Sequence, residues 1–328
     1  MTPASPTPPD EIEALARERA GARASRDFAR ADVLRASIEA AGWRVTDRGT
    51  GFRLDPAAPP TVETVGVLRH GSPGTVPSVL DEAASARFTV LLIADDWPDD
   101  LARILGDLRV HAPDGTHVVI VANDPTPAQA ERLAPGSPDL APIAGAEPEV
   151  LWTSARLGHA SALNAGLRRA RAEVVVLAET SVEVTGDALT PLLEAFADPS
   201  VAVAGGFGVV GPDLRHLAET AGPDVDAIEG HWLAFRRADI AMLGPLDGKF
   251  VSPHGLDTWW SLVLRAGTGS DLPPRRARQL ELPLVRHVRT GAVSADAAQR
   301  DRLARRNVYR LLERFRDRAD LLSGTHGR

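Results

Sequence analysis

Glu179, Thr180 and Ser181 could do chemistry because of where they stand in the sequence. They directly follow the apolar run "VVVLA", which is typical of a buried strand. Divalent cations such as Mg²⁺ take oxygen ligands, often one or two carboxylates together with substrate phosphates. We therefore expect Glu179 and Ser181 to lie at a site for a metal ion and a phosphate. The alternative is that they are solvated side chains in an ordinary turn.

Asp257 is the candidate for acid–base chemistry. It lies at the start of "LDTWWSLVLRAG", a segment whose pattern predicts a helix. A carboxylate held there can take a proton from an attacking hydroxyl group. The helix dipole would lower its pKa, whereas burial beside Trp259 or Trp260 would raise it. The alternative is that Asp257 only caps the helix.

Paired polar side chains also follow two other predicted strands, "FTVLLIA" and "HVVIVAN". Asp95 and Asp96 come after the first strand, and Asn123 and Asp124 close the second. Ligands of open α/β sheets bind at the carboxyl ends of the strands. We expect these four side chains to bind the base and ribose of a nucleotide. Helix capping is the alternative, especially for Asp96.

The elements that must position these residues alternate between strand and helix from residue 87 onward. Further strands are predicted at "EVLWT", "EVVVLAE" and "VAVAGG". Helices are predicted from Pro98 to about His111, at 158–172 and at 187–197. This alternation predicts a parallel sheet covered by helices, and the fold class is therefore α/β.

The first part of the chain is organised differently. Residues 1–9 are rich in Pro, Thr and Ser and predict a disordered tail. Residues 10–55 predict a small module of two helices and a hairpin. Residues 56–86 predict a connector that contains one strand at 62–68. The main domain is then 87–328, which ends in a C-terminal helix.

The composition excludes several classes of function. The 328 residues carry a net charge of −7, which disfavours non-specific binding of nucleic acid. There is no cysteine, so disulfides, thiolate metal sites and cysteine nucleophiles are excluded. No apolar run approaches the roughly 20 residues of a membrane span, and the first residues lack the pattern of a secretory signal. We expect a cytoplasmic protein without a membrane span or a nucleic-acid partner.

One glycine motif is not expected to bind a cofactor. Residues 206–211 fit Gly-x-Gly-x-x-Gly after a predicted strand. A dinucleotide site requires a helix that begins within the glycines. Here Val209 and Val210 continue as strand and Pro212 follows, so we do not predict a dinucleotide site.

Four ordered segments of the second half carry a resemblance to a known family. They are "RLGHASALNAGLRRARAEVVVLAETSV", "IEGHWLAFRRADIAMLGPLDGKF", "HGLDTWWSLVLRAG" and "LPLVRHV". Together they resemble the family 2 inverting glycosyltransferases of the GT-A type over about residues 87–322. The first is similar to the family segment whose strand ends in Asp-x-Asp. The third is similar to the Glu-Asp helix that carries the catalytic base.

The resemblance implies a GT-A fold, a Rossmann-like and mostly parallel sheet with helices on both faces. It implies transfer of a sugar from a nucleotide-diphosphate donor to an acceptor hydroxyl, with Asp257 as general base. Glu179, Ser181 and His287 would bind a Mg²⁺ or Mn²⁺ ion, and Arg156 in the first segment would belong to the donor site. For His287, an ordinary structural role is the alternative.

Four further side chains are candidates for binding the acceptor or the leaving diphosphate. Arg236 and Arg237 could bind a phosphate or carboxylate, and Trp232 and Trp259 could stack on a sugar. The alternatives are a structural ion pair for the arginines and a place in the core for the tryptophans.

The departures from the family pattern leave a second hypothesis open. The Asp-x-Asp has become Glu179-Thr180-Ser181, and the Glu-Asp has become Leu256-Asp257. A chain with these changes could instead be a non-catalytic, glycosyltransferase-like binding or adaptor protein.

The N-terminal module carries a separate resemblance. The segment "RDFARADVLRASIEAAGWRVTDRGTG" resembles the C-terminal region of cysteinyl-tRNA synthetases over about 40 residues. The resemblance implies a reused structural or interaction module and brings no synthetase active site with it. Contact with RNA or protein through this module belongs to the alternative of a non-catalytic adaptor.

Overall fold

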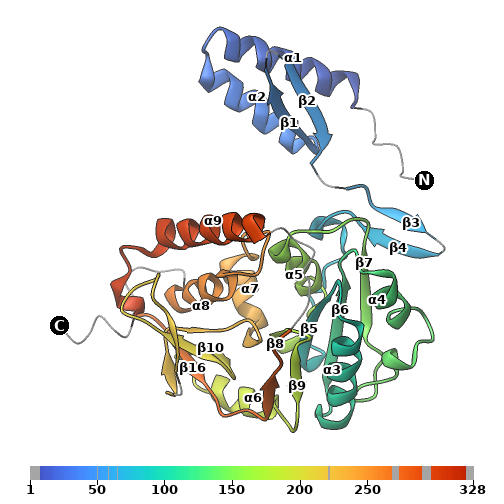
Figure 1. The fold of residues 1–328 in the computed structure, drawn as a ribbon, viewed down its shortest axis with the longest axis vertical. Helices are drawn as coiled ribbons and strands as arrows, with labels where there is room; N and C mark the ends of the chain where they lie inside the picture. The colour runs from blue at the N-terminus through green and yellow to red at the C-terminus, as the bar shows by residue number, and fades with distance from the viewer. Residues whose placement is uncertain are drawn as a thin grey trace. The chain divides into compact units, whose positions relative to one another are not determined.

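The computed structural model describes residues 8–49, 51–57, 59–64, 66–220, 222–267, 273–289 and 297–322. The chain divides into two compact units, Met1–Ser72 and Pro73–Arg328 (Figure 1). Apart from residues 8 and 9, the predicted tail lies outside the described residues. The boundaries predicted at residues 55 and 86 stay predictions.

The first unit contains the two helices and the hairpin expected from the sequence. Its elements are α1 (Asp10–Ala24), α2 (Phe28–Ala40), β1 (Trp43–Arg48), β2 (Gly51–Pro56), β3 (Val62–Thr64) and β4 (Val67–His70). The Asp27 carboxylate caps α2 by accepting a hydrogen bond from the backbone N–H of Arg30. The strand expected at 62–68 is instead the antiparallel pair β3 and β4, because Gly66 takes a positive φ of 73° between them.

The second unit is built on a mixed sheet in which parallel pairs predominate at the centre. Along the sheet its strands are β13 (Asp224–Val225), β16 (Arg276–Gln279), β10 (Val201–Gly205), β15 (Trp232–Arg236), β8 (Ala172–Ala178), β5 (Ala86–Ala94), β6 (Thr116–Ala122) and β7 (Glu149–Thr153). The β5–β6, β5–β8, β6–β7 and β10–β16 pairs are parallel. β15 runs antiparallel between β8 and β10.

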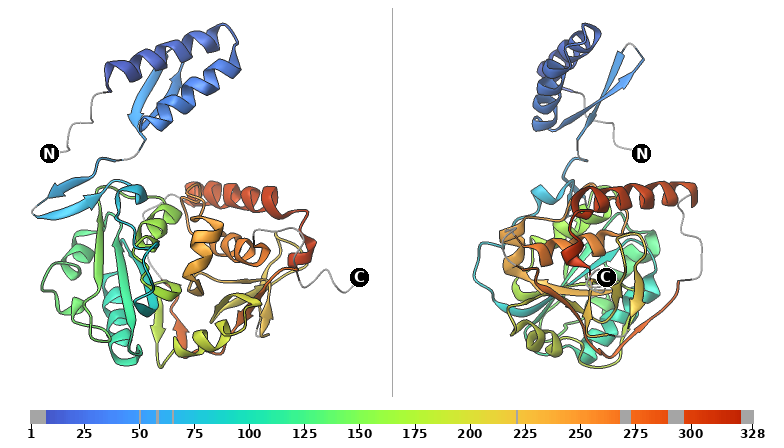
Figure 2. Two further views of the ribbon diagram at one scale, coloured as in Figure 1. Left: turned by 180° about the vertical axis from the view of Figure 1, so that it is seen from behind. Right: turned by 90° about the vertical axis from the view of Figure 1, so that its left-hand side faces the viewer.

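Helices cover both faces of this sheet (Figure 2). They are α3 (Pro98–His111), α4 (Pro127–Arg132), α5 (His159–Leu167), α6 (Thr190–Phe196), α7 (Arg237–Leu243), α8 (Leu256–Ala266) and α9 (Ala297–Phe315), with 3-10 turns at Pro73–Thr75, Pro138–Leu140 and Ala319–Leu321. Alternate residues of β5 serve two cores: Leu91 packs with α5, α7, α8 and α9, whereas Val90 and Leu92 pack with α3 and α6. The predicted α/β class is therefore confirmed.

Two smaller sheets complete the second unit. One contains β12 (Ala218–Thr220), β11 (Gly208–Val210) and β14 (Ala227–Ile228), and the other pairs β9 (Val182–Val184) with β17 (Leu284–Arg286). Val209 and Val210 thus continue as strand, and no helix begins within residues 206–211. None of the helices in the described ranges is long and apolar enough to span a membrane. The cytoplasmic location stays a prediction.

α3 has the bounds predicted from the sequence but a different N-cap residue, and the bounds of α5 and α6 differ from the expectation. The N-cap of α3 is Trp97, in a left-handed conformation with φ 65°, rather than Asp96. α6 begins at Thr190, because the Asp187 carboxylate accepts hydrogen bonds of 2.9 Å from the N–H groups of Leu189 and Thr190 and so holds a turn before the helix. α5 ends at Leu167, before the residues that lead into β8.

Candidate active site

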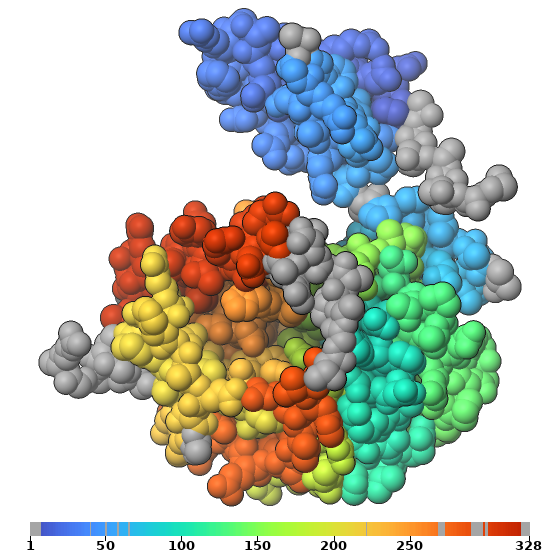
Figure 3. All heavy atoms as spheres, viewed as in Figure 1, coloured from blue at the N-terminus to red at the C-terminus, as the bar shows by residue number. Residues whose placement is uncertain are grey.

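A pocket of about 1080 Å³ opens at the carboxyl ends of β5 and β8. Its walls come from the strand ends, from the first turns of α5 and α8, from residues 229 and 230, and from α9. In the space-filling view the second unit is hollowed below α9 and beside α8 (Figure 3). Pockets that hold small ligands usually measure about 300–1,000 Å³, so this one has room for a large ligand or two smaller ones.

Glu179 lies on the pocket wall directly after β8. Its carboxylate accepts a hydrogen bond of 3.3 Å from the Ser181 hydroxyl, and its Oε2 lies 3.6 Å from Nε2 of His231. Its backbone N–H donates to the carbonyl oxygen of His231 over 3.1 Å. Glu179 and Thr180, which follow the strand as expected, therefore line the pocket.

Asp257 lines the same pocket at the start of α8, which follows Gly255 in a left-handed conformation. Its Oδ2 accepts a hydrogen bond from the N–H of Gly230 over 3.0 Å, and its Oδ1 accepts one from Thr258 over 2.7 Å. Burial raises the pKa of the Asp257 carboxyl against the opposing effect of these two N–H donors, and the charge of Glu179 raises it further. Burial is the largest of these effects.

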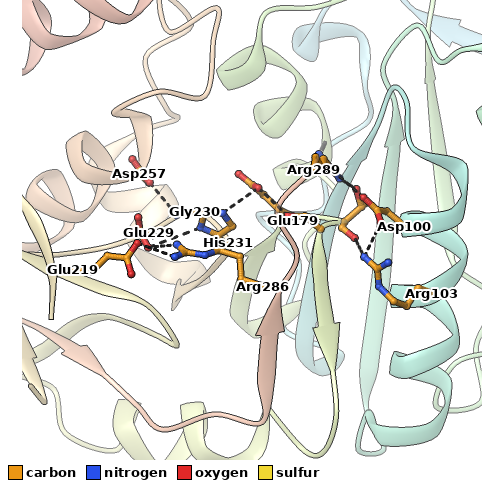
Figure 4. A network of polar contacts seen from close by, with 12 residues as sticks. Asp100, Arg103, Glu179, Glu219, Glu229, Gly230, His231, Asp257, Arg286 and Arg289 are labelled. Carbon is orange, nitrogen blue, oxygen red and sulfur yellow. Dashed lines mark hydrogen bonds and ion pairs between the residues drawn. The ribbon is translucent and has the colours of Figure 1, made fainter. Parts of the chain in front are cut away.

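Residues 229–231 lie between these two carboxylates (Figure 4). Gly230 contacts Asp257, and His231 contacts Glu179 on the other side. Glu229 lines the pocket and forms a 3.0 Å ion pair with Arg286; burial raises its pKa. The sequence analysis missed this turn, because its position depends on β15 pairing antiparallel beside β8, with Trp232 opposite Ala178.

Two of the predicted nucleotide-binding side chains lie with Glu179 at the pocket. They are Asp95 and Arg156, whose charged groups form a 3.1 Å ion pair. His159, which the sequence analysis also missed, lines the pocket nearby, and burial lowers its pKa while the charges of Glu179 and Asp95 oppose that shift. A histidine with a lowered pKa is neutral near pH 7 and can both donate and accept hydrogen bonds.

Four other predicted nucleotide-binding residues do not line the pocket: Asn123, Asp96, Asp124 and Ser181, which is 4% exposed. The side chain of Asn123 is only 4% exposed and exchanges two hydrogen bonds with the backbone of Leu157, at 2.8 and 3.1 Å. The Asp96 carboxylate accepts from the N–H of Trp97 over 2.8 Å. Asp124 is exposed, with a positive φ of 53°. These residues shape the loops around the site.

The candidates for the acceptor or diphosphate also lie elsewhere. Trp232 is fully buried and Trp259 is 5% exposed, so both belong to the core. Arg236 donates to the carbonyl oxygens of Val201, Phe196 and Asp198 over 2.6 to 2.9 Å. Arg237 donates to those of Val79, Ala170 and Glu82 over 2.8 to 3.4 Å. The arginines thus bind backbone carbonyls within the fold.

His287 lies outside the pocket lining as well. Its Nε2 is 2.7 Å from Oε2 of Glu183, across the β9–β17 pair. Within the described parts of the chain, no group of three or more His, Asp or Glu side chains is placed to hold a metal ion. Glu179, Ser181 and His231 therefore fit an ion only if substrate phosphates complete its ligands.

Residues 96–245 match the family model described as glycosyl transferase family 2. The segment is similar to the domain of family 2 glycosyltransferases and makes up somewhat less than half of the chain. It includes Glu179 and residues 229–231, and it ends before Asp257. This match confirms the family resemblance read from the sequence.

The solved structures similar to this chain include GalNAc-T7, determined with UDP, GalNAc and Mn²⁺. The TM-score is 0.56 at 14% identity, over 73% of this chain and 49% of that one, so the chain spans about half of that protein. This likeness shows a shared GT-A fold. A mannosyltransferase of Pyrobaculum calidifontis, solved with GDP-Man and Mn²⁺, is 23% identical over 64% of this chain and 60% of that one, with a TM-score of 0.43.

The curated relatives match a different and much shorter part. The cysteine–tRNA ligase of Opitutus terrae is 51% identical over 49 residues, which are 15% of this chain and 11% of the ligase. That of Burkholderia lata is 50% identical over 46 residues, 14% of this chain and 10% of the ligase. The chain thus spans about a tenth of the curated relatives that it matches.

Proposed function

We propose that this protein is an inverting glycosyltransferase that moves a sugar from a nucleoside-diphosphate donor to an acceptor hydroxyl. One observation carries the proposal: in a family 2 domain, residues 230 and 231 join Asp257 and Glu179 across a single pocket. Asp257 then activates the acceptor hydroxyl, and Glu179 stabilises the leaving diphosphate. A direct displacement needs both tasks: a base for the acceptor hydroxyl and a group that stabilises the leaving diphosphate.

Asp257 is the general base of this reaction. Its carboxylate takes the proton of the acceptor hydroxyl while that oxygen forms a bond to the anomeric carbon. The bond from the anomeric carbon to the diphosphate oxygen breaks, and its electron pair leaves with the nucleoside diphosphate. A single displacement inverts the configuration at the anomeric carbon. The raised pKa of Asp257 makes it a stronger base than an ordinary aspartate.

Glu179 and Ser181 are proposed to bind a Mg²⁺ or Mn²⁺ ion together with the donor, with His231 beside them in the place expected for His287. Such an ion neutralises charge that develops on a departing diphosphate. The similar GalNAc-T7 structure was determined with Mn²⁺ and UDP, which supports this assignment. Asp95, Arg156 and His159 are proposed to bind the rest of the nucleotide from the ends of β5 and the start of α5.

Calorimetric titration with UDP, GDP, dTDP and CDP, each with and without Mn²⁺, tests the donor site. We expect one of these nucleotides to bind, and Glu179→Ala to weaken that binding in the presence of Mn²⁺. The matched control is Glu183→Ala, since Glu183 is a nearby glutamate that does not line the pocket. A nucleotide Kd that is the same with and without Mn²⁺ would remove the metal ion from the proposed mechanism.

The transfer itself is tested by the product. With the donor sugar of the nucleotide that binds, NMR of the glycoside formed should show an anomeric configuration opposite to that of the donor. Retention would refute a single displacement. If none of the four nucleotides binds, the non-catalytic binding protein becomes the better description.

A further inference from the structure

Two arginines donate hydrogen bonds to Thr180. Thr180 is the central residue of Glu179–Ser181, the three residues that follow β8, which we call the lip. Arg289 donates from Nη2 to the Thr180 hydroxyl, and Arg103 donates from Nη2 to the Thr180 carbonyl oxygen over 3.3 Å. Both arginines also pair with Asp100, at 2.9 Å for Arg289 and 2.7 Å for Arg103. Thr180 therefore accepts hydrogen bonds from both cations of a cluster of two arginines and one carboxylate. Figure 4 shows the cluster as Arg103, Arg289 and Asp100.

The charges of this cluster do not balance. Burial raises the pKa of Asp100, but hydrogen bonds and charge from the two arginines outweigh burial and lower it, so Asp100 is ionised near neutral pH. One carboxylate can neutralise only one of the two guanidinium groups. Among the described residues, the ion pairs of Arg103 and of Arg289 are both made with Asp100. The cluster therefore presents a net positive charge beside Glu179.

Of the two arginines, Arg289 is the one that lines the pocket. Its side chain is 28% exposed, and its guanidinium lies over the ring of Trp97, 5.3 Å from the centroid. Trp97 also lines the pocket and holds its left-handed backbone conformation there. The two hydrogen bonds to Asp100 and Thr180 use two of the five N–H donors of a guanidinium. Arg289 can therefore bind an anion without leaving its place.

We propose that Arg289 binds the diphosphate of the donor at the carboxyl end of β8, where it contacts Thr180. The proposal rests on the proposed function and extends it. A guanidinium matches phosphate oxygens with paired, charge-assisted hydrogen bonds. Trp97 and Asp100 fix its plane, so little conformational entropy is lost when the phosphate binds. Arg289 thus stabilises the leaving group directly, alongside whatever ion Glu179 binds.

The test compares the best-binding nucleoside diphosphate of the panel above with its monophosphate, on wild type, Arg289→Gln and Arg289→Lys. We expect Arg289→Gln to raise the Kd of the diphosphate about tenfold or more, and that of the monophosphate by less than about threefold. The loss should be larger in EDTA than in Mn²⁺. Arg289→Lys should fall between, because lysine keeps the charge but not the fork.

Arg103→Gln is the matched control. It removes the same kinds of contact to Asp100 and Thr180 from a side chain outside the pocket lining. We expect it to lower the thermal midpoint as much as Arg289→Gln while leaving the diphosphate Kd within about threefold of wild type. An equal loss of affinity in both variants would show that the arginines only hold the lip, and would overturn the proposal.

Two further outcomes separate this proposal from the function on which it rests. An unchanged diphosphate Kd in Arg289→Gln, with wild type binding normally, would overturn the role of Arg289 and leave the transferase assignment standing. If wild type binds none of the four nucleoside diphosphates, both proposals fall together.

Discussion

The Oδ2 atom of Asp257 lies 3.0 Å from the backbone nitrogen of Gly230, the residue that precedes the histidine beside Glu179. This hydrogen bond fixes the plane of the carboxylate that we propose as the base. It also makes the geometry of the base depend on the same turn that faces the donor side. A change in that turn should therefore affect both halves of the reaction.

Asp257→Asn tests the base directly. We expect kcat to fall about 100-fold or more, because the amide cannot accept the proton of the acceptor. The Kd of the nucleoside diphosphate should stay within about threefold, since Asp257 does not touch the donor in this scheme. Initial rates and calorimetry give the two numbers. Asp247→Asn, a change outside the pocket lining, is the control and should leave kcat unchanged. Full activity in Asp257→Asn would assign the base elsewhere.

The pH dependence of the wild-type enzyme should report the same carboxyl group. Because burial raises the pKa of Asp257, the base becomes protonated at a higher pH than the ordinary value of 3.8. The acid limb of kcat/KM should therefore have an apparent pKa above 3.8, and Asp257→Asn should lose that limb. A flat profile from pH 4 to 8 would contradict the assignment.

The same shift predicts an effect on stability. A carboxyl whose pKa is raised by folding stabilises the native state while it is protonated, and this contribution is lost as pH rises through the folded pKa. Asp257→Asn should therefore gain thermal stability relative to wild type between acidic pH and pH 8. Thermal midpoints at several pH values measure the difference, and a constant difference across that range would count against the raised pKa.

The two histidines near the lip should behave differently. His231 lies 3.6 Å from Glu179, whereas His287 is paired with Glu183 outside the pocket lining. We expect His231→Ala to raise the nucleotide Kd in Mn²⁺ about tenfold, because the ion would lose either a ligand or a side chain that positions a ligand. His287→Ala should leave that Kd unchanged. The reverse result would restore His287 as the metal-site histidine expected from the sequence.

Arg236 should matter for stability and not for binding. It donates to three carbonyl oxygens and lies over the ring of Phe196, 5.0 Å from the centroid. Arg236→Gln should cost about 2–4 kcal/mol in the free energy of unfolding, because buried carbonyl groups lose a charged donor. Urea denaturation measures that loss. The nucleotide Kd should not change, and a large rise in Kd in a folded variant would return Arg236 to the site.

Two glycines give a matched test of the packing. A Cβ at Gly205 would lie 2.1 Å from the carbonyl oxygen of Trp232, whereas one at Gly106 in α3 would meet nothing within 4 Å. We expect Gly205→Ala to destabilise the fold by about 1–3 kcal/mol. Gly106→Ala should stabilise it by up to about 1 kcal/mol, from helix propensity. Unfolding free energies of equal sign would refute this contrast.

The sequence predicted the elements of the second unit well because buried parallel strands leave long apolar runs. It also placed Glu179, Asp95 and Asp257 correctly on the ends of elements, and these do meet at one pocket. The sequence could not distinguish a polar side chain that binds a ligand from one that forms hydrogen bonds with the backbone. Asn123 has the same local setting as Asp95, and only the loop that brings Leu157 to it decides its role.

The residues that sequence reasoning missed share a different cause. His231 reaches Glu179 only because β15 enters the sheet antiparallel beside β8. Arg289 reaches Thr180 after β17 pairs with β9, about a hundred residues earlier in the chain. Such long-range pairings leave no local periodicity in the sequence, so no short motif could indicate them.

The position of α9 has a consequence for the order in which the walls of the pocket form during synthesis. Asn307 ties α9 to the loop before α8 by donating to the carbonyl oxygens of Ser252 and His254, at 3.3 and 2.8 Å, and the same helix forms one wall of the pocket. Chains fold from the N-terminus as they leave the ribosome. A nascent chain can therefore build its sheet and donor side while the wall formed by α9 is still missing. The pocket is therefore complete only after α9 has been synthesised and has docked on the loop before α8.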